Sequence, residues 1–172
     1  VIFLPLVGSI ITYFGKRIGN LFSQGFSCLM VSVSAVLSFL LFYDVITNGN
    51  YGNYVIFEWI HSGNLHVNWS IKIDPLSSVM LMVGTSVSAL VHIDAIGYMS
   101  HDPHKPRFMS YLSLFTFSML CLVVSDNFLQ LFFGWEGVGL CSYLLIGFWY
   151  KREAANNAAI KAFIVNRVGD FG

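Results

Sequence analysis

Charged residues are scarce in this sequence. Lysine, arginine, aspartate and glutamate make up 10% of the 172 residues, and hydrophobic residues make up 56%, whereas roughly 25% of a typical soluble domain is charged. The nine basic and nine acidic residues cancel, so the charge balance gives no reason to expect nucleic acid as a partner. This is the composition of a protein whose surface faces lipid.

Cysteine is also scarce, and the three that occur are far apart. Cys28, Cys121 and Cys141 each lie within an apolar run, without the spacing of metal ligands. They therefore exclude a cysteine cluster that would hold iron and sulfur in this chain. We interpret them as small packing residues and expect no disulfide framework and no metal site.

An initiator methionine and a basic leader are missing as well, so the start of the sequence shows no signal-peptide pattern. The first residues are apolar, and the last continue a helical pattern without a polar tail. From these two features we expect the chain to be one piece of a larger membrane protein.

Apolar runs recur along nearly the whole chain, and a helix of about 20 residues is enough to cross ~30 Å of hydrocarbon. Hydropathy and helix-breaking residues together predict an all-α polytopic membrane protein with about six transmembrane helices. Asp74 followed by Pro75 marks the start of the third helix, and Pro103 and Pro106 mark the loop after it. The expected helices cover residues 1–15, 25–46, 75–99, 108–125, 127–150 and 154–172.

One long polar connection, residues 47–73, divides the chain into a first pair of helices, residues 1–46, and a four-helix region, residues 74–172. Within the connection, YVIFEWI and LHVNWSIKI are rich in β-branched and aromatic residues and lie on either side of HSGN. This pattern predicts a short β-hairpin on the membrane surface.

The basic residues indicate an orientation. If the helices alternate in direction, six basic residues fall on one side of the membrane and Lys72 alone falls on the other, while the last two lie in the sixth helix. This bias places the basic side toward the cytoplasm or the mitochondrial matrix. The six are Lys16, Arg17, Lys105, Arg107, Lys151 and Arg152.

Glu136 is the single charged residue in the fifth helix and lies near its middle. A charge at that depth costs on the order of 2.5 to 3.5 kcal/mol on insertion scales, so it needs a partner, water or neutralisation. Gly134, Gly137 and Cys141 form a stripe of small residues beside it, which favours a closely packed neighbouring helix. Glu136 is therefore a candidate proton carrier; the alternative is a protonated glutamate that bonds across a helix interface.

The sixth helix is more polar than the others and holds Lys161, Arg167 and Asp170. Arg167 and Asp170 are three residues apart and can pair on one face, with Lys161 pointing elsewhere. Such a pair is either structural or part of a charge relay. In the third helix, His92 is a further candidate because histidine titrates near neutral pH, although a single histidine is more often a packing or interface residue than a proton carrier.

Four blocks of this sequence closely resemble one family. They are DPLSSVMLMVGTSVSALVHI, GYMSHDPHKPRFMSYLSLFTF, DNFLQLFFGWEGVGLCSYLLIGFWY and KAFIVNRVGDFG. They resemble the mitochondrial form of chain 5 of NADH-ubiquinone oxidoreductase, respiratory complex I. The resemblance covers nearly the whole chain and is strongest from Asp74 to Gly172.

The resemblance implies an antiporter-like subunit of the membrane arm, related to subunits of multi-subunit sodium/proton antiporters. The glutamate of GWEG, here Glu136, would be the key intramembrane acid, paired in the family with a lysine of the seventh helix. Arg167 and Asp170 would lie at the contact with the adjacent pumping subunit and take part in the charge relay. Asp94 departs from the family, whose members usually carry an uncharged or aromatic residue after LVH.

From the residues and the resemblance together we expect the N-terminal part of a subunit of the H+-translocating NADH:ubiquinone reductase, in the mitochondrial inner membrane or a bacterial plasma membrane. Expected partners are the other membrane-arm subunits, the remainder of chain 5 and lipid. No cofactor is expected in this chain; NADH, FMN, iron-sulfur clusters and ubiquinone belong elsewhere in the complex. The alternatives are a stand-alone cation/proton antiporter and a structural scaffold.

Overall fold

The computed structural model describes residues 1–15, 19–63 and 65–172. It confirms the predicted class, with six helices and one antiparallel hairpin between the second and third helices. The elements are α1 (Phe3–Phe14), α2 (Asn20–Asn48), β1 (Gly52–Ser62), β2 (Leu65–Ile73), α3 (Pro75–Tyr98), α4 (Lys105–Val123), α5 (Phe128–Ile146) and α6 (Glu153–Phe171).

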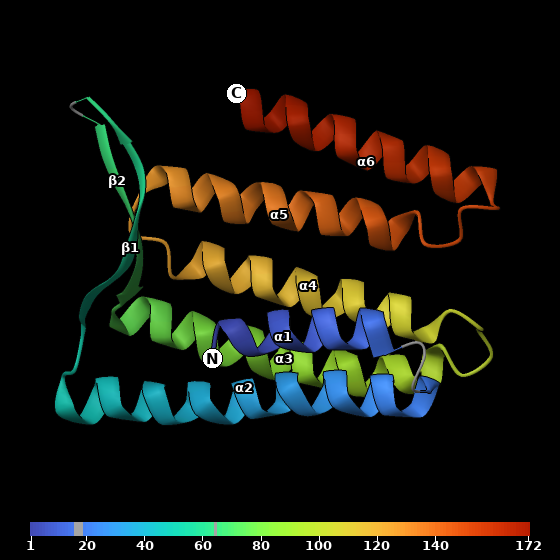
Figure 1. The fold of residues 1–172 in the computed structure, drawn as a ribbon, viewed down its shortest axis with the longest axis horizontal. Coiled ribbons are helices and arrows are strands. Elements are labelled where there is room, and N and C mark those ends of the chain that lie inside the picture. Colours follow the sequence, from blue (N-terminus) through green and yellow to red (C-terminus); the bar gives the residue numbers. More distant parts are fainter. Residues whose placement is uncertain (16–18, 64) are drawn as a thin grey trace.

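The helices lie side by side with alternating direction, and the hairpin crosses one end of the bundle (Figure 1). Helices α2, α3 and α4 contact one another, α1 packs on α2 and α4, α5 packs on α4, and α6 packs on the far side of α5. Helix α6, red in Figure 1, is therefore the outermost layer. This order matters for function because it places the most polar helix beside the one that contains Glu136.

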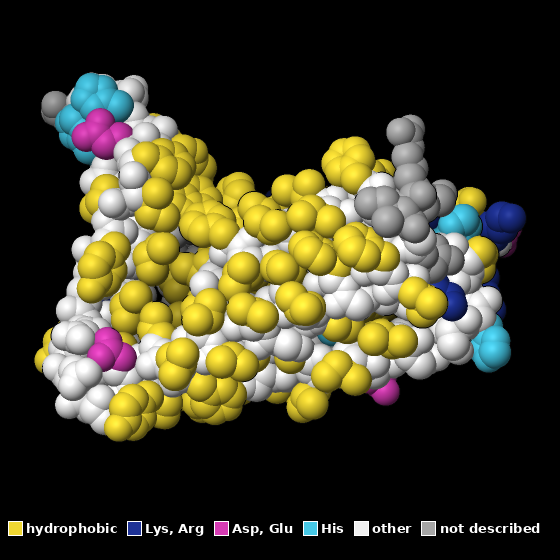
Figure 2. All heavy atoms as spheres, turned by 60° about the horizontal axis from the view of Figure 1, so that its bottom comes forward, with side chains coloured by type: hydrophobic (Ala, Val, Ile, Leu, Met, Phe, Trp, Pro, Cys, Tyr) yellow, Lys and Arg dark blue, Asp and Glu magenta, His cyan; other side chains and the backbone are white. Residues whose placement is uncertain are grey.

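The outer surface of the bundle is apolar along its length. Within the described residues, α2, α3, α4 and α5 are each long and apolar enough to cross a membrane, whereas α1 has 12 residues. Helix α6 has 19 residues but includes four charged ones. Large hydrophobic side chains cover the long face shown in Figure 2, as expected for a surface in contact with lipid.

Basic side chains gather at the end of the bundle opposite the hairpin (Figure 2). Lys105 and Arg107 begin α4, and Lys151 and Arg152 precede α6, while Lys72 lies on β2 at the hairpin end. The structure thus confirms the predicted segregation for these five residues. The other two basic residues assigned to this end, Lys16 and Arg17, lie outside the described residues.

Several helix boundaries differ from the prediction. Helix α2 begins at Asn20 and not at residue 25, and α5 ends at Ile146 and not at residue 150. Pro106 does not interrupt a helix, because it lies in the first turn of α4, which begins at Lys105. Proline is tolerated there because the N–H groups of a first turn have no partner within the helix.

The hairpin is attached to the start of α5 by hydrogen bonds. Gln130 is fully buried; its Nε2 donates to the backbone oxygen of Ser70 over 2.8 Å, and its Oε1 accepts from the backbone N–H of Ser70 over 3.1 Å. Trp69 packs against Phe133, with 5.0 Å between ring centroids. The predicted surface hairpin is therefore a fixed cap on this end of the bundle.

Helices α4 and α5 approach each other closely along the small-residue stripe. A Cβ atom at Gly134 would lie 2.7 Å from the backbone nitrogen of Leu122, and one at Gly137 would lie 2.8 Å from Ser118 Oγ. Cys141 Sγ lies 4.0 Å from the same Ser118 oxygen. The stripe predicted on this helix thus faces α4, where small residues allow close packing.

Asp74 and Ser77 form a capping box at the start of α3. The Ser77 N–H donates to Asp74 Oδ1 over 2.6 Å, and the Asp74 N–H donates to Ser77 Oγ over 2.8 Å. These bonds satisfy two backbone donors that have no acceptor within the helix. The bond from the Ser77 N–H holds the pKa of the Asp74 carboxyl below its ordinary value of 3.8.

We expect Gly134→Ala to destabilise the parent protein by about 1 to 3 kcal/mol, because the new methyl group meets the α4 backbone. Gly169→Ala is the matched control on α6, since a Cβ there meets no atom within 4 Å and alanine favours a helix by roughly 1 kcal/mol over glycine. Thermal melting in detergent measures both; equal melting temperatures would contradict the close α4 and α5 contact.

We expect Asp74→Ala to cost about 0.5 to 2 kcal/mol of stability near neutral pH, because a helix cap is lost. The lowered pKa means that the carboxylate stabilises the fold above pH 3.8 and loses this contribution as the pH falls through its folded-state pKa. Asp74→Asn keeps a capping oxygen without titrating, so its melting temperature should fall less than that of the unmodified protein on acidification. Identical acid dependence would show that the carboxylate is not the titrating cap.

Candidate functional site

The candidate site lies at the contact between α5 and α6. The two helices are antiparallel, and pairs of residues meet at successive turns along their common length. Aromatic, charged and small residues alternate in this contact, so the two helices have a defined register. The pairs are Trp135 with Asp170, Glu136 with Arg167, Gly139 with Asn166, Tyr143 with Phe163, and Gly147 with Ala159.

Glu136 forms an ion pair with Arg167 of α6, joining Oε1 to Nη1. The Glu136 side chain is 21% exposed and the Arg167 side chain is 50% exposed, so the carboxylate lies in the contact and the guanidinium lies at its edge. The guanidinium carbon also lies 5.0 Å from the centroid of the Phe163 ring. The expectation that Glu136 faces another helix is confirmed.

The predicted pair between Arg167 and Asp170 is wrong. Arg167 turns to Glu136, and Asp170 Oδ1 instead accepts a hydrogen bond from Trp135 Nε1 over 2.6 Å. Both acids of the site are therefore held across the interface, each by a donor from the other helix. The spacing of three residues made a pair within α6 possible. Once the helices pack, Arg167 and Asp170 each bind a side chain of α5 instead.

Trp135 is a site residue that the sequence reasoning missed. The sequence shows that Trp135 stands next to Glu136. Its indole N–H, however, donates to Asp170 on α6, which is thirty-five residues further along the chain. A buried or interfacial tryptophan usually needs such an acceptor, so an aspartate on the next polar helix was the available signal. The antiparallel register decided which aspartate it is.

A groove of about 390 Å³ adjoins the ion pair. It lies between α4, α5 and α6, and both Glu136 and Arg167 line it. Its other walls are mostly apolar, with Ser118 Oγ and Cys141 Sγ as further polar atoms. A second pocket of about 540 Å³ includes Trp135 and Asp170. The two acids therefore face separate spaces, one bordering α4 and one confined to α5 and α6.

Lys161 is not brought into this site. It lies exposed on α6, two turns from Arg167, and forms no ion pair within the described residues. Asp94 is likewise exposed, on α3. The part of the chain that the structure describes contains no group of three or more His, Cys, Asp and Glu side chains arranged to hold a metal ion.

His92 lies in a separate polar cluster inside the bundle. It is fully buried; Nδ1 lies 2.7 Å from the Ser88 backbone oxygen, and Nε2 lies 3.1 Å from Ser113 Oγ. Because a carbonyl oxygen only accepts, Nδ1 donates to Ser88, and a second hydrogen bond joins Nε2 to the Ser113 hydroxyl. Ser113 Oγ in turn lies 2.6 Å from Ser27 Oγ, so the cluster joins α2, α3 and α4.

A similar fold occurs in a solved membrane complex. A chain of the membrane-bound sulfane sulfur reductase, an archaeal respiratory membrane complex, superimposes with a TM-score of 0.81 over 98% of this chain and 33% of that one. The sequences are 18% identical, so this likeness establishes the fold alone.

Two family profiles match the sequence. Residues 59–109 match "NADH-Ubiquinone oxidoreductase (complex I), chain 5 N-terminus", and residues 125–172 match "NADH:quinone oxidoreductase/Mrp antiporter, TM". The second profile includes Glu136, Arg167 and Asp170.

Curated relatives match along the whole chain. It is 54% identical to NADH-ubiquinone oxidoreductase chain 5 of Chondrus crispus over 100% of its length, and 53% identical to subunit L of the NADH-quinone oxidoreductase of Rickettsia conorii over 99%. The chain spans 26% of the length of each of these relatives. The chain therefore belongs to the family of NADH-ubiquinone oxidoreductase chain 5 and corresponds to its N-terminal portion.

Proposed function

We propose that the chain is part of the proton-translocating membrane subunit of NADH:quinone oxidoreductase, and that Glu136 takes up and releases the translocated proton. The observation that carries this proposal is the ion pair between Glu136 and Arg167 at the edge of a groove. An acid that is paired, partly accessible and surrounded by membrane-spanning helices is suited to change its protonation state when its partner moves.

Arg167 controls the charge of Glu136 in this mechanism. While the guanidinium is in contact, it favours the ionised carboxylate. When the guanidinium moves away, Glu136 is left as a charge in low-dielectric surroundings and binds a proton. The half-exposed side chain of Arg167 has room for that movement, because one side of it is not covered by α5.

Asp170 provides the alternative partner for Arg167. It lies one turn along the same helix, which is within reach of an arginine side chain, and Trp135 holds it in the observed state. Movement of Arg167 from Glu136 to Asp170 would exchange an interhelical pair for an intrahelical one. The proton affinity of Glu136 would rise in this step, and the reverse step would release the proton.

Lys161 and His92 are the remaining residues of the proposed relay. Lys161, exposed on α6, would meet a charged group from a neighbouring segment or subunit. His92 would add a second protonatable group through its chain of contacts to Ser113 and Ser27. Both assignments are predictions, and they are secondary to the pair on α5 and α6.

Energy for the transport has to come from elsewhere in the assembly. Moving one charge against a membrane potential costs about 2.3 kcal/mol per 100 mV. We propose that redox chemistry supplies it, with NADH, FMN, iron-sulfur clusters and ubiquinone bound by other subunits. The proposed partners are the adjacent antiporter-like subunit and the remainder of chain 5. The proposed location is the mitochondrial inner membrane, with the bacterial plasma membrane as the alternative because relatives of both origins match.

A stand-alone cation/proton antiporter is the second candidate, since the profile for residues 125–172 also describes an Mrp antiporter. The purified parent protein, reconstituted in vesicles without redox partners, distinguishes the two. Proton exchange that depends on an added cation would favour the antiporter, whereas transport only in the assembled, NADH-driven complex would favour the first proposal.

We expect Glu136→Gln to reduce proton pumping per NADH oxidised in the assembled complex severalfold, because glutamine does not carry the proton. Glu153→Gln is the control, since Glu153 is an exposed acid at the start of α6. Pumping is measured as vesicle acidification at matched NADH oxidation rates. Unchanged pumping in a fully assembled Glu136→Gln complex would leave this residue with a structural role.

A double-mutant cycle tests the pair itself. We expect Arg167→Gln alone to lower the stability of the parent protein, and Arg167→Gln combined with Glu136→Gln to cost less than the sum of the single changes. A coupling of about 0.5 to 3 kcal/mol is expected for groups in contact. Lys161→Gln with Glu136→Gln is the matched cycle and should be additive. Additivity in both cycles would contradict the observed ion pair.

A further inference from the structure

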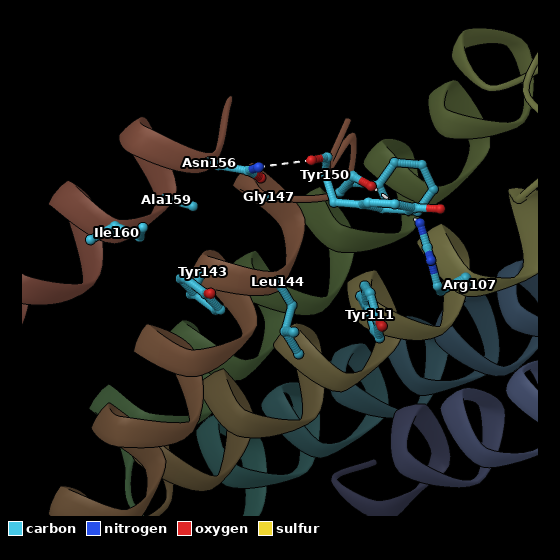
Figure 3. Close-up of a pocket in the computed structure, with 10 residues that line it drawn as sticks. Arg107, Tyr111, Tyr143, Leu144, Gly147, Tyr150, Asn156, Ala159 and Ile160 are labelled. Carbon is cyan, nitrogen blue, oxygen red and sulfur yellow. Dashed lines mark hydrogen bonds between the residues drawn. The ribbon is translucent and has the colours of Figure 1, made fainter. Parts of the chain in front are cut away.

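A pocket of about 420 Å³ opens at the basic end of the bundle, where α4 begins, α5 ends and α6 begins (Figure 3). Its walls differ in character. Tyr111 and Tyr143 contribute aromatic rings with hydroxyl groups, and Leu144 and Ile160 contribute an apolar side. Arg107 rises toward Tyr150 at one end of the pocket (Figure 3).

Arg107 is held in this pocket by its surroundings. Nη2 donates to the Phe148 backbone oxygen over 3.1 Å, and the guanidinium carbon lies 4.7 Å from the Phe148 ring centroid and 5.7 Å from that of Tyr150. Nε is buried and has no hydrogen-bond partner among the described residues. A guanidinium has five N–H donors, and the one side-chain hydrogen bond that Arg107 makes with the described residues uses one of them.

The local charge favours an anion. Arg107 forms no ion pair with any carboxylate of residues 1–15, 19–63 and 65–172. Asp102, an acid in the adjoining loop, already accepts hydrogen bonds from the His104 N–H and from Trp149 Nε1. Lys105 begins α4, and Lys151 and Arg152 directly precede α6 at the same end of the bundle, so the pocket lies in a region of excess positive charge.

We propose that this pocket binds the phosphate group of an anionic phospholipid, with the Arg107 guanidinium as its main donor. Basic pockets between membrane helices suit such head groups, and arginine matches phosphate oxygens with paired donors. Trp149 and Tyr150 place this end at the depth where aromatic residues meet lipid head groups. The apolar wall of Leu144 and Ile160 would contact an acyl chain, which free phosphate does not have.

The test uses the complete parent protein in its purified membrane complex. The complex is stripped of lipid and titrated with phosphatidylglycerol, and the bound lipid is counted by mass spectrometry. We expect Arg107→Gln to weaken retention of one phosphatidylglycerol by about tenfold or more, the effect of losing a charge-assisted hydrogen bond. Arg152→Gln is the matched control, because it removes the same charge from the same end but Arg152 does not line the pocket. Equal retention in the two variants would overturn the proposal.

A second variant leaves Arg107 intact and fills the pocket. Ile160→Trp should displace the same lipid, whereas Ile164→Trp, one turn further along α6 and outside the pocket lining, should not. Inorganic phosphate should fail to compete at millimolar concentration; displacement by phosphate alone would assign the pocket to free phosphate and overturn the lipid proposal. Detection of another protein segment in the pocket by crosslinking from position 160 would overturn it as well. These readouts do not depend on proton pumping.

Discussion

Hydrocarbon offers no hydrogen-bond partner, and this constraint accounts for most of the arrangement of this chain. Backbone groups in the bundle are paired within helices, and the sheet lies across one end, where its strands need not face lipid (Figure 1). Several polar side chains inside the bundle pair across helices, as His92 does with Ser113. The charge on Glu136 obeys the same rule and is matched by Arg167.

Helix α5 contacts α4 with one face and α6 with another. Gly134 and Gly137 bring the α4 backbone close and fix that contact, while Glu136 turns toward α6 and borders a groove. Close packing on one side therefore leaves the charged pair on the looser side. This division suits the proposed role of Glu136, because α4 holds its helix closely while the side chain of Arg167 is half exposed.

The two ends of the bundle are built for different surroundings. At the hairpin end, the buried side-chain amide of Gln130 forms two hydrogen bonds with the backbone of Ser70. At the opposite end, Arg107 keeps unused donors beside aromatic rings and an open pocket. The basic residues gather at this second end, which agrees with the predicted orientation of the chain and with the anion site proposed there. The proposed proton carrier and the proposed lipid pocket thus lie at different depths of the same three helices.

The sequence by itself determined the helices, the hairpin, the basic end and the position of Glu136 in mid-helix, because these follow from periodicity, composition and helix signals within single segments. Only the tertiary structure decided that Arg167 pairs with Glu136 and that Asp170 takes its hydrogen bond from Trp135. The sequence showed only that Arg167 and Asp170 could pair, since spacing within one helix can be read from the chain. The register between α5 and α6 is not readable in this way, because it depends on how whole surfaces pack.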